Sequence, residues 1–521
     1  MDSVNDTSPR FNMTYQDSNN KRIAVNTIML YIRMFIIMGV SLYTSRIVLL
    51  SLGVEDYGIY NVVAGFVSMF TFINSAMTSA TQRYITFAIG RGELDRINKV
   101  FSTCMNIHAL ISIILLIVAE TFGLWFLNTK MTIPIERIEA ANVVFQIALL
   151  STVVMILSVP YNAMIVAYEK MSAFAYISIF DVSFKLLVAY ILFISPFDRL
   201  IVYATLLFLV QLIIRQIYRI YCQRKFPESR YKWVWDKSLF REMVSFSAWS
   251  LFGNLASVFS GQGVNVVLNM FFGPVVNAAR GVAFQVQSAV HGFSGNFQMA
   301  MNPQITKNYA NGDLNRMHNL IFASSKFSYY LLFLISLPVI LEADTLLGVW
   351  LKEVPPHTVN FLRIVLFTIA FNSLAGPFTI SAQANGNIKT YQITVGGILL
   401  LTLPLAYIGL RLFDIPEIVY VIDLIIVIIA QIARLFFMRI MVRLSIQRYL
   451  LQVILPITIV TFVASIIPIA SYMYMPKNTF ISFFSVCVIS LLSVSLTIYY
   501  IGISKEERMK VNSFIRKKLH F

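Results

Sequence analysis

Apolar segments of about twenty residues recur along the whole chain, and short polar stretches separate them. An α-helix needs about 20 consecutive apolar residues to cross a bilayer. The pattern therefore predicts an all-α polytopic membrane protein with fourteen transmembrane helices. Their predicted ranges are 23–50, 59–87, 100–127, 143–167, 173–194, 200–221, 244–271, 276–301, 321–341, 359–383, 390–410, 418–441, 450–474 and 479–503.

A sequence unit near the start of the chain returns in its second half. Leu52-Gly53-Val54-Glu55-Asp56 opens a segment that closes with Gly90-Arg91-Gly92, and Phe272-Gly273 and Asn311-Gly312 repeat this frame 220 residues later. In each copy the closing glycine follows the opening glycine by 39 residues. Self-similarity at a fixed spacing indicates a duplicated unit. We interpret Gly92 and Gly312 as left-handed helix ends rather than as parts of a phosphate-binding loop.

The duplication predicts two lobes of six helices each. Because six is an even number, both copies enter the membrane in the same sense, as in transporters built from two parallel repeats with a substrate path between them. The predicted domains are a cytoplasmic tail 1–22, an N-lobe 23–222, a cytoplasmic linker 223–243, a C-lobe 244–441, two further helices 442–503 and a basic tail 504–521.

Composition excludes several other classes of protein. Of the 521 residues 58% are hydrophobic and 13% are charged, which is far less charge than a soluble domain carries. The net charge of +16 reflects Lys and Arg concentrated in the loops on one side, which predicts cytoplasmic termini and gives no support for a nucleic-acid partner. The sequence has no metal-ligand spacing or cofactor loop, so we expect neither metal nor cofactor.

Charged side chains inside the predicted spans need a physical reason, because each costs about 2.5–3.5 kcal/mol at the bilayer centre on insertion scales. Arg33 lies near mid-depth of the first span without an acid in its own helix, which favours a distant partner or an anionic ligand. Arg280, in the first turns of the eighth span, is also interpreted as functional. Arg46 and Arg83 lie close enough to an interface to snorkel, so structural and functional roles both stay open.

Of the remaining charges, two are predicted to pair and the others are left open. Asp181 and Lys185 are four residues apart on one helical face, which predicts a structural pair. Asp423 and Arg434 share a face of the twelfth span three turns apart, and Arg363 is compatible with either role. Asp181 and Asp423 are the buried carboxylates that an ion-coupled pump would require.

The stretch from Leu52-Gly53-Val54-Glu55-Asp56 to Tyr57-Gly58-Ile59-Tyr60, with a second span ending in Gly90-Arg91-Gly92-Glu93, resembles the polysaccharide-biosynthesis exporters. These are oligosaccharide-lipid (O-antigen, Wzx-type) flippases of the MOP exporter superfamily, which also contains the MATE drug exporters. The resemblance covers 23–441, and an additional pair of spans is common among these flippases.

The resemblance implies a flippase of the bacterial inner membrane that moves polyprenyl-diphosphate-linked oligosaccharide to the periplasmic leaflet by alternating access, for lipopolysaccharide or other surface polysaccharide. It implies a cationic cavity to which Arg33, Arg46, Arg83, Arg280 and, more weakly, Lys185 contribute, because arginine forms bidentate, charge-assisted hydrogen bonds to phosphate. Membrane lipid, a polysaccharide polymerase and other assembly proteins are the implied partners.

There are two alternatives, one of the same functional class and one of a different class. MATE-like cation-coupled export of small organic molecules would use Asp181 or Asp423, although the first span has no acidic residue. A membrane polysaccharide polymerase or ligase needs a large periplasmic loop, and the outer loops near 128–142 and 342–358 are too short to form one.

Overall fold

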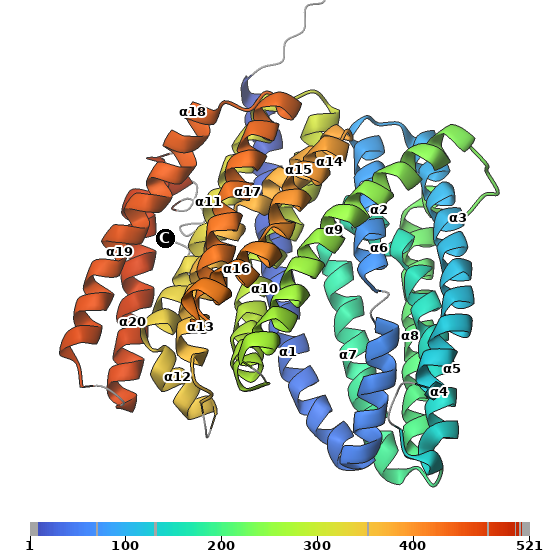
Figure 1. Cartoon of the computed structure of the whole chain (residues 1–521). Helices are drawn as coiled ribbons and strands as arrows, with labels where there is room; N and C mark the ends of the chain where they lie inside the picture. The colour runs from blue at the N-terminus through green and yellow to red at the C-terminus, as the bar shows by residue number, and fades with distance from the viewer. Residues whose placement is uncertain are drawn as a thin grey trace, which may run out of the picture. The chain divides into compact units, whose positions relative to one another are not determined.

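The computed structural model describes residues 9–68, 71–129, 133–272, 274–351, 354–476, 479–505, 507–509 and 512. These residues form α-helices joined by short turns, and no strand occurs among them (Figure 1). Helices suit a bilayer because each one satisfies its backbone hydrogen bonds internally. The prediction of an all-α polytopic fold is therefore confirmed.

The chain divides into two compact units, residues 1–251 and 252–521, and the division falls within helix α9 (Lys237–Phe272). In the first unit α1 packs against α5 and α7, α5 packs against α8, and α2 packs against α3 and α6. The helices of this unit that precede α9 are α1 (Pro9–Ser68), α2 (Thr71–Gly90), α3 (Leu94–Val118), α4 (Leu124–Thr129), α5 (Ile138–Ile156), α6 (Val159–Ala167), α7 (Met171–Ile194) and α8 (Arg199–Lys225).

In the second unit α10 packs against α11, α13 and α14, and α17 packs against α13 to α16. Helices α19 and α20 lie side by side and contact α11 (Figure 1). The helices after α9 are α10 (Pro274–Ala310), α11 (Leu314–Leu341), α12 (Ala343–Trp350), α13 (Thr358–Asn372), α14 (Ala375–Asn385), α15 (Lys389–Leu400), α16 (Thr402–Phe413), α17 (Ile418–Val442), α18 (Ile446–Tyr449), α19 (Leu455–Tyr474) and α20 (Phe480–Thr497).

Twelve helical segments of the described chain are long and apolar enough to cross a membrane. They coincide with twelve of the fourteen predicted spans. The predicted span 59–87 falls on the end of α1 and on α2, with residues 69 and 70 outside the described part. The predicted span 276–301 falls within α10, a continuous helix that carries many Asn, Gln and Ser side chains.

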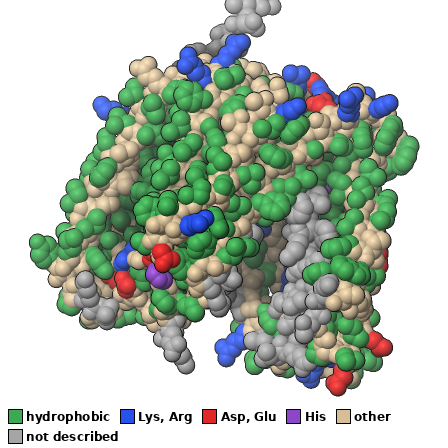
Figure 2. All heavy atoms as spheres, viewed as in Figure 1, with side chains coloured by type: hydrophobic (Ala, Val, Ile, Leu, Met, Phe, Trp, Pro, Cys, Tyr) green, Lys and Arg blue, Asp and Glu red, His purple; other side chains and the backbone are tan. Residues whose placement is uncertain are grey.

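The outer surface of these helices is apolar, as a lipid-facing surface must be. Hydrophobic side chains are spread widely over the described part of the face seen in Figure 2, and the charged side chains are few by comparison. On α19 and α20, for example, Phe462, Ile466 and Leu492 are exposed. Such a surface would be insoluble in water, and its exposure is consistent with contact to hydrocarbon chains.

The two copies of the duplicated unit end in the same turn. Gly92 and Gly312 both adopt left-handed backbone conformations, with φ of 70° and 76°. In the first copy the amide of Glu93 bonds the carbonyl of Ala88, and in the second the amide of Asp313 bonds the carbonyl of Asn308. This confirms the interpretation of both glycines as helix ends, since glycine takes this conformation without a Cβ penalty. Gly273, the opening glycine of the second copy, lies outside the described residues.

The duplication extends to a break in one transmembrane segment of each unit. The segment Ile135–Ala167 is interrupted between α5 and α6, and Thr358–Asn385 is interrupted between α13 and α14. Proline follows each break, at Pro160 in α6 and at Pro377 in α14. Proline within the first turn of a helix is tolerated because its missing amide would have no intrahelical partner there.

The kink in α1 depends on Gly53, whose φ of 78° and ψ of 169° are accessible only to glycine. We expect Gly53→Ala to lower the free energy of unfolding by about 1–3 kcal/mol. An added Cβ would meet nothing within 4 Å, so the loss would be conformational rather than steric.

Gly39→Ala is the matched control, because Gly39 lies in the same helix and also has nothing within 4 Å of an added Cβ. This change should be neutral or slightly stabilising, since alanine has the higher helix propensity. Thermal unfolding of the purified variants measures both effects, and equal behaviour of the two would contradict the role assigned to Gly53.

Candidate functional sites in each half

Arg33 is a cation with an unsatisfied donor in the first unit. Its guanidinium carbon lies 4.6 Å from the ring centre of Phe174 on α7. Its Nε is buried and has no hydrogen-bond partner among the described residues. Tyr218 of α8 lies within electrostatic range of both Arg33 and Asp181. Arg33 thus has aromatic contact but spare hydrogen-bonding capacity, which is the arrangement that an anionic group can complete.

Arg46 and Arg83 differ in their surroundings. Arg46 is exposed on the surface of α1. The side chain of Arg83 is only 10% exposed and lies 3.9 Å from Glu242 of α9. Its guanidinium stacks on aromatic rings, at 4.4 Å from Tyr84 and 5.1 Å from Phe246. Arg83 therefore connects α2 to the start of α9 through aromatic and ionic contacts, which favours its structural interpretation.

Glu242 lines a cavity of about 650 Å³ in the first unit, formed by the turn after α2, the start of α3 and the start of α9. The charged lining residues of this cavity are Glu93, Asp95, Arg96, Lys99, Asp236 and Glu242. Asp236 accepts hydrogen bonds from the backbone amides of Ser238 and Leu239, which holds the pKa of its carboxyl below the usual range. The mixed charges are consistent with a hydrated vestibule and do not select one substrate.

Arg280 lies in a polar cluster of the second unit. Its Nη2 donates to the carbonyl of Gly261 at 2.7 Å, and its Nη1 donates to the Tyr420 hydroxyl at 3.4 Å. Asp423 lies within electrostatic range of the same guanidinium. The structure thereby brings together a predicted substrate residue and a predicted ion-coupling residue, 143 positions apart in sequence.

The predicted pair on α7 is present, and the structure also shows the contacts of Arg434 and Arg363, whose roles the sequence left open. Lys185 Nζ lies 2.7 Å from Asp181 Oδ2. Arg434 is buried and donates to Gln431 Oε1 at 3.5 Å, and the described residues include no ion pair between Arg434 and Asp423. Arg363 pairs with Asp344 at 2.8 Å and donates to the Ile340 carbonyl at 3.0 Å, which favours a structural role for this arginine.

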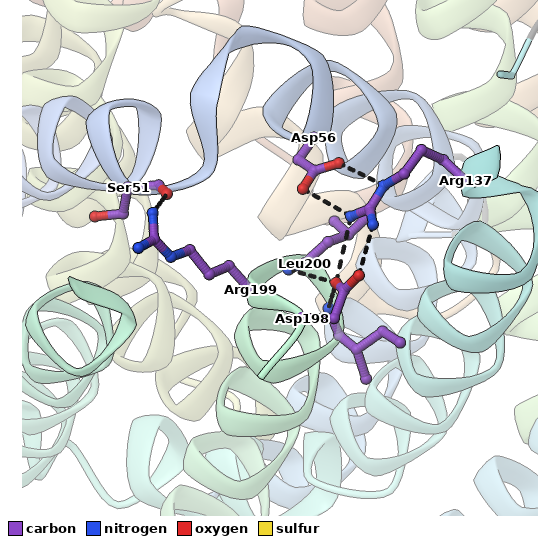
Figure 3. A network of polar contacts seen from close by, with 7 residues as sticks. Ser51, Asp56, Arg137, Asp198, Arg199 and Leu200 are labelled. Carbon is purple, nitrogen blue, oxygen red and sulfur yellow. Dashed lines mark hydrogen bonds and ion pairs between the residues drawn. The ribbon is translucent and has the colours of Figure 1, made fainter. Parts of the chain in front are cut away.

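A second group of charges lies at the ends of helices and was not predicted from the sequence. Arg137, just before α5, binds two carboxylates (Figure 3). Its Nε and Nη2 lie 2.9 and 2.7 Å from the two oxygens of Asp56, and its Nη1 lies 2.5 Å from Asp198. Asp198 also caps α8 by accepting from the amides of Leu200 and Ile201.

The surroundings of Asp198 stabilise its charged form. Burial opposes ionisation, but the hydrogen bonds and charge of Arg137 and the helix amides outweigh it and hold the pKa of the Asp198 carboxyl below its ordinary value. Nearby, Arg199 Nη1 donates to the backbone carbonyl of Ser51 at 2.9 Å (Figure 3). These contacts join α1, α5 and α8 at one end of the first unit.

Lys326 was also missed, although a lysine stands within the predicted ninth span. Its side chain is 9% exposed, and its ammonium lies 2.6 Å from Glu507, after the last helix. Glu507 accepts from the amide of Ser504, and its own amide donates to the Ser504 hydroxyl. This reciprocal pattern is a capping box. The spacing of Ser504 and Glu507 in the sequence could have predicted the capping box. It could not have predicted the contact of Glu507 with Lys326 of α11, because the two residues are 181 positions apart.

Metal binding finds no structural support within the described residues, where no group of three or more His, Cys, Asp and Glu side chains is placed to hold an ion. Free Cys104 and Cys222 are buried.

Residues 30–191 match the sequence model of the MatE family. No curated protein matches the sequence significantly. Among solved structures, a MATE protein in the bent conformation is 13% identical, with a TM-score of 0.71 and coverage of 82% of this chain and 96% of that chain. A Vibrio cholerae MATE transporter is 17% identical, with a TM-score of 0.70 and coverage of 81% and 97%.

A third similar structure is a MOP superfamily transporter from Pyrococcus furiosus, described as having a binding pocket of reverse polarity that suggests a different function. It is 11% identical, with a TM-score of 0.68 and coverage of 80% of this chain and 95% of that chain. These likenesses show that the chain has the fold of MATE transporters. They support the MATE-like part of the predicted fold and add nothing specific to oligosaccharide-lipid flippases.

Proposed function

We propose that this protein is a membrane transporter that exports an organic molecule by alternating access between its two halves. The observation that carries this proposal is the MATE-type fold, shared over 80–82% of the chain with transporters at TM-scores of 0.68–0.71. The equivalent turns at Gly92 and Gly312 and the equivalent helix breaks support two halves built on one plan. Transporters of two repeats commonly work by motion of one repeat against the other.

The fold comparisons favour small organic molecules as the substrate class, because one similar structure is described as a multidrug resistance MATE family transporter. Cation coupling is part of this proposal. Asp423 beside Arg280 is the described carboxylate best placed to couple to a substrate or ion in the second unit. Asp181, the other sequence candidate, is already paired with Lys185.

Arg33 supplies a second candidate, in which the exported molecule carries an anionic group. The guanidinium has an unsatisfied buried Nε, and arginine binds phosphate and carboxylate with charge-assisted hydrogen bonds. A polyprenyl-diphosphate-linked oligosaccharide is the finer version of this candidate. The bacterial inner-membrane location, the cytoplasmic termini and partnership with a polysaccharide polymerase stay predictions of the sequence.

A transport assay in proteoliposomes with three probes separates these candidates. The probes are a cationic dye, a carboxylate-bearing fluorescent amphiphile and a fluorescent polyprenyl-diphosphate sugar. Transport of the cationic dye alone would support multidrug-type export and overturn the anionic candidate. Transport of the diphosphate probe alone would support the flippase candidate, and movement of none of the probes would contradict both substrate proposals.

We expect Arg33→Gln to reduce transport of an anionic probe at least about tenfold, because a charged hydrogen bond contributes about 1.5–3 kcal/mol. Arg46→Gln is the matched control, since Arg46 lies on the same helix but is exposed. The initial transport rate is compared at equal amounts of reconstituted protein. Unchanged anion transport by Arg33→Gln would remove Arg33 from the substrate site.

A further inference from the structure

The two halves carry an acid–base pair at equivalent positions. Arg137 immediately precedes α5 and contacts Asp198, which immediately precedes α8. In the second half, His357 immediately precedes α13 and contacts Glu417, which immediately precedes α17. The two bases are 220 positions apart and the two acids 219, which matches the 220-residue duplication. The pairs are thus related by the duplication, but their bases differ chemically.

In the first half the base is an arginine, which stays charged at every physiological pH. It binds Asp198 and also Asp56 of α1, so its guanidinium is held by two carboxylates. Neither the charge nor the planar geometry of this pair changes when the pH varies in the neutral range. The first half therefore has a pair whose charges do not change in the neutral pH range.

In the second half the base is a histidine. His357 Nδ1 lies 2.7 Å from Glu417 Oε1, and Asn360 Nδ2 donates to the same oxygen at 3.0 Å. The imidazole stacks on Phe361, with ring centres 6.0 Å apart and an interplanar angle of 23°. The histidine side chain is 39% exposed, whereas that of Glu417 is 17% exposed. The imidazole is thus accessible to solvent protons while its acceptor is largely covered.

Few other charges act on this pair within the described residues. Burial of Glu417 opposes its ionisation, but hydrogen bonds from Asn360 and His357 outweigh it and hold the pKa of its carboxyl below the usual range. The Tyr420 hydroxyl also lies within electrostatic range of Glu417. Of the other charged residues in this unit, Asp344 pairs with Arg363, Arg280 lies near Asp423, and Asp414 is exposed. Lys352 and Glu353 lie outside the described residues.

We propose that His357 and Glu417 form a proton-binding site that joins the amino-terminal ends of α13 and α17. With a proton bound, the imidazolium and the carboxylate form an ion pair with a charge-assisted hydrogen bond. When the proton leaves, the pair is reduced to a hydrogen bond between a neutral ring and a carboxylate, and the two helix ends are held less tightly. Histidine is the side chain that can gain or lose a proton in the neutral pH range.

The site also suggests which ion drives transport, a step that rests on the proposed function. Protonation at one end of the second half would stabilise one arrangement of α13 and α17, while the arginine pair of the first half stays unchanged. A ligand shifts a conformational equilibrium only through its different affinity for the two states. The proton meets this condition here, because the pair can bind it tightly only while the two helix ends are together.

Exchanging the two bases tests the proposal. His357→Arg gives the second half the permanent base of the first, and Arg137→His gives the first half a titrating base. We expect the unfolding temperature of the wild type to fall by about 2 °C between pH 5.5 and pH 8 through this pair. His357→Arg should lose that difference, and Arg137→His should acquire an additional one. An unfolding temperature with the same pH dependence in wild type and His357→Arg would overturn the proton site.

Hydrogen exchange provides a local readout that does not depend on global stability. At pH 8, amides near the start of α13 should exchange several-fold more slowly in His357→Arg than in the wild type. Amides at the start of α5 serve as the internal control and should be unchanged. Equal exchange at the start of α13 in both proteins would contradict the proposed tightening of the helix ends.

A transport assay tests the proton site and the proposed function separately. Wild-type transport that is driven by an inward proton gradient, and that loses this dependence in His357→Arg, supports proton coupling through the pair. Undiminished gradient dependence in His357→Arg would overturn the coupling role while leaving transport itself established. Absence of transport by the wild type at every pH would contradict the proposed function, while the unfolding data would still decide whether the proton site exists.

Discussion

Glu507→Gln lowers the free energy of unfolding far more than Lys326→Met. Glutamine preserves the capping box with Ser504, because it can accept the same amide hydrogen bond, but it removes the negative charge from the ammonium of Lys326. The lysine side chain is 9% exposed, so its charge has little access to water. Breaking a buried ion pair from one side leaves an uncompensated charge, which costs about 3–5 kcal/mol.

Lys326→Met removes the buried charge instead of isolating it. Methionine fills a similar volume, and replacement of a buried ion pair by apolar side chains is often close to neutral. Glu507 is left at 26% exposure, where water can solvate it in part. We therefore expect a loss of about 1 kcal/mol or less for this variant.

The double variant Lys326→Met/Glu507→Gln completes a double-mutant cycle. It should be more stable than Glu507→Gln alone, because the isolated charge is gone. Chemical denaturation of detergent-solubilised protein measures the four stabilities. If the two single losses simply add, Lys326 and Glu507 do not interact, and the contact between α11 and the C-terminal segment contributes no coupling energy.

Arg137→Met has the second large effect, because one guanidinium serves two carboxylates. The side chains of Arg137, Asp56 and Asp198 are 24%, 21% and 32% exposed, so the network is only partly screened by water. Without the arginine, two negative charges face each other at the joined ends of α1, α5 and α8 (Figure 3). We expect a loss of about 2–3 kcal/mol, below the value for a fully buried pair.

The difference between wild type and Arg137→Met should depend on pH in a defined direction. The pKa of Asp198 in the folded protein is lowered from its ordinary value of 3.8, so its contribution to stability is present above that pH. The contribution is lost as the pH falls through the lowered pKa of the folded state. The two proteins should therefore converge in stability below about pH 4, and a constant difference at all pH values would argue against an ionic origin.

Arg137→Lys is the control that keeps the positive charge but removes the planar hydrogen-bonding geometry of the guanidinium. The arginine makes hydrogen bonds to both oxygens of Asp56 and to Asp198 through a rigid planar group. Lysine places a single point charge on a flexible stem and cannot reproduce this fork. An intermediate stability is expected, and wild-type stability in this variant would show that charge alone accounts for the network.

Much of the fold could be predicted because its determinants are local. A hydrophobic run of spanning length specifies a membrane helix wherever it occurs, and twelve of the predicted spans coincide with helices that meet this condition. The turns at Gly92 and Gly312 could also be predicted from the sequence, because glycine adopts the left-handed backbone conformation more readily than other residues. The pair of Asp181 and Lys185 followed from helical spacing alone.

The candidate site was harder to predict from the sequence, because its chemistry depends on contacts between residues that are distant in sequence. Arg33 and Arg83 look alike as single arginines in apolar spans. Only the structure shows that Arg83 contacts Glu242 and aromatic rings, whereas the Nε of Arg33 has no hydrogen-bond partner among the described residues. Lys326 and Glu507 are 181 positions apart, and no periodicity connects them.

The sequence by itself determined the helices, their order and the duplication, because hydrophobic length and glycine conformation act within a few residues. The tertiary structure alone decided which charges neutralise one another, because the energy of a charge in a membrane depends on the groups within a few ångströms of it. The equivalent pairs of Arg137 with Asp198 and of His357 with Glu417 depend on both the sequence and the tertiary structure. Their positions follow from the duplication, and only folding brings each base to its acid.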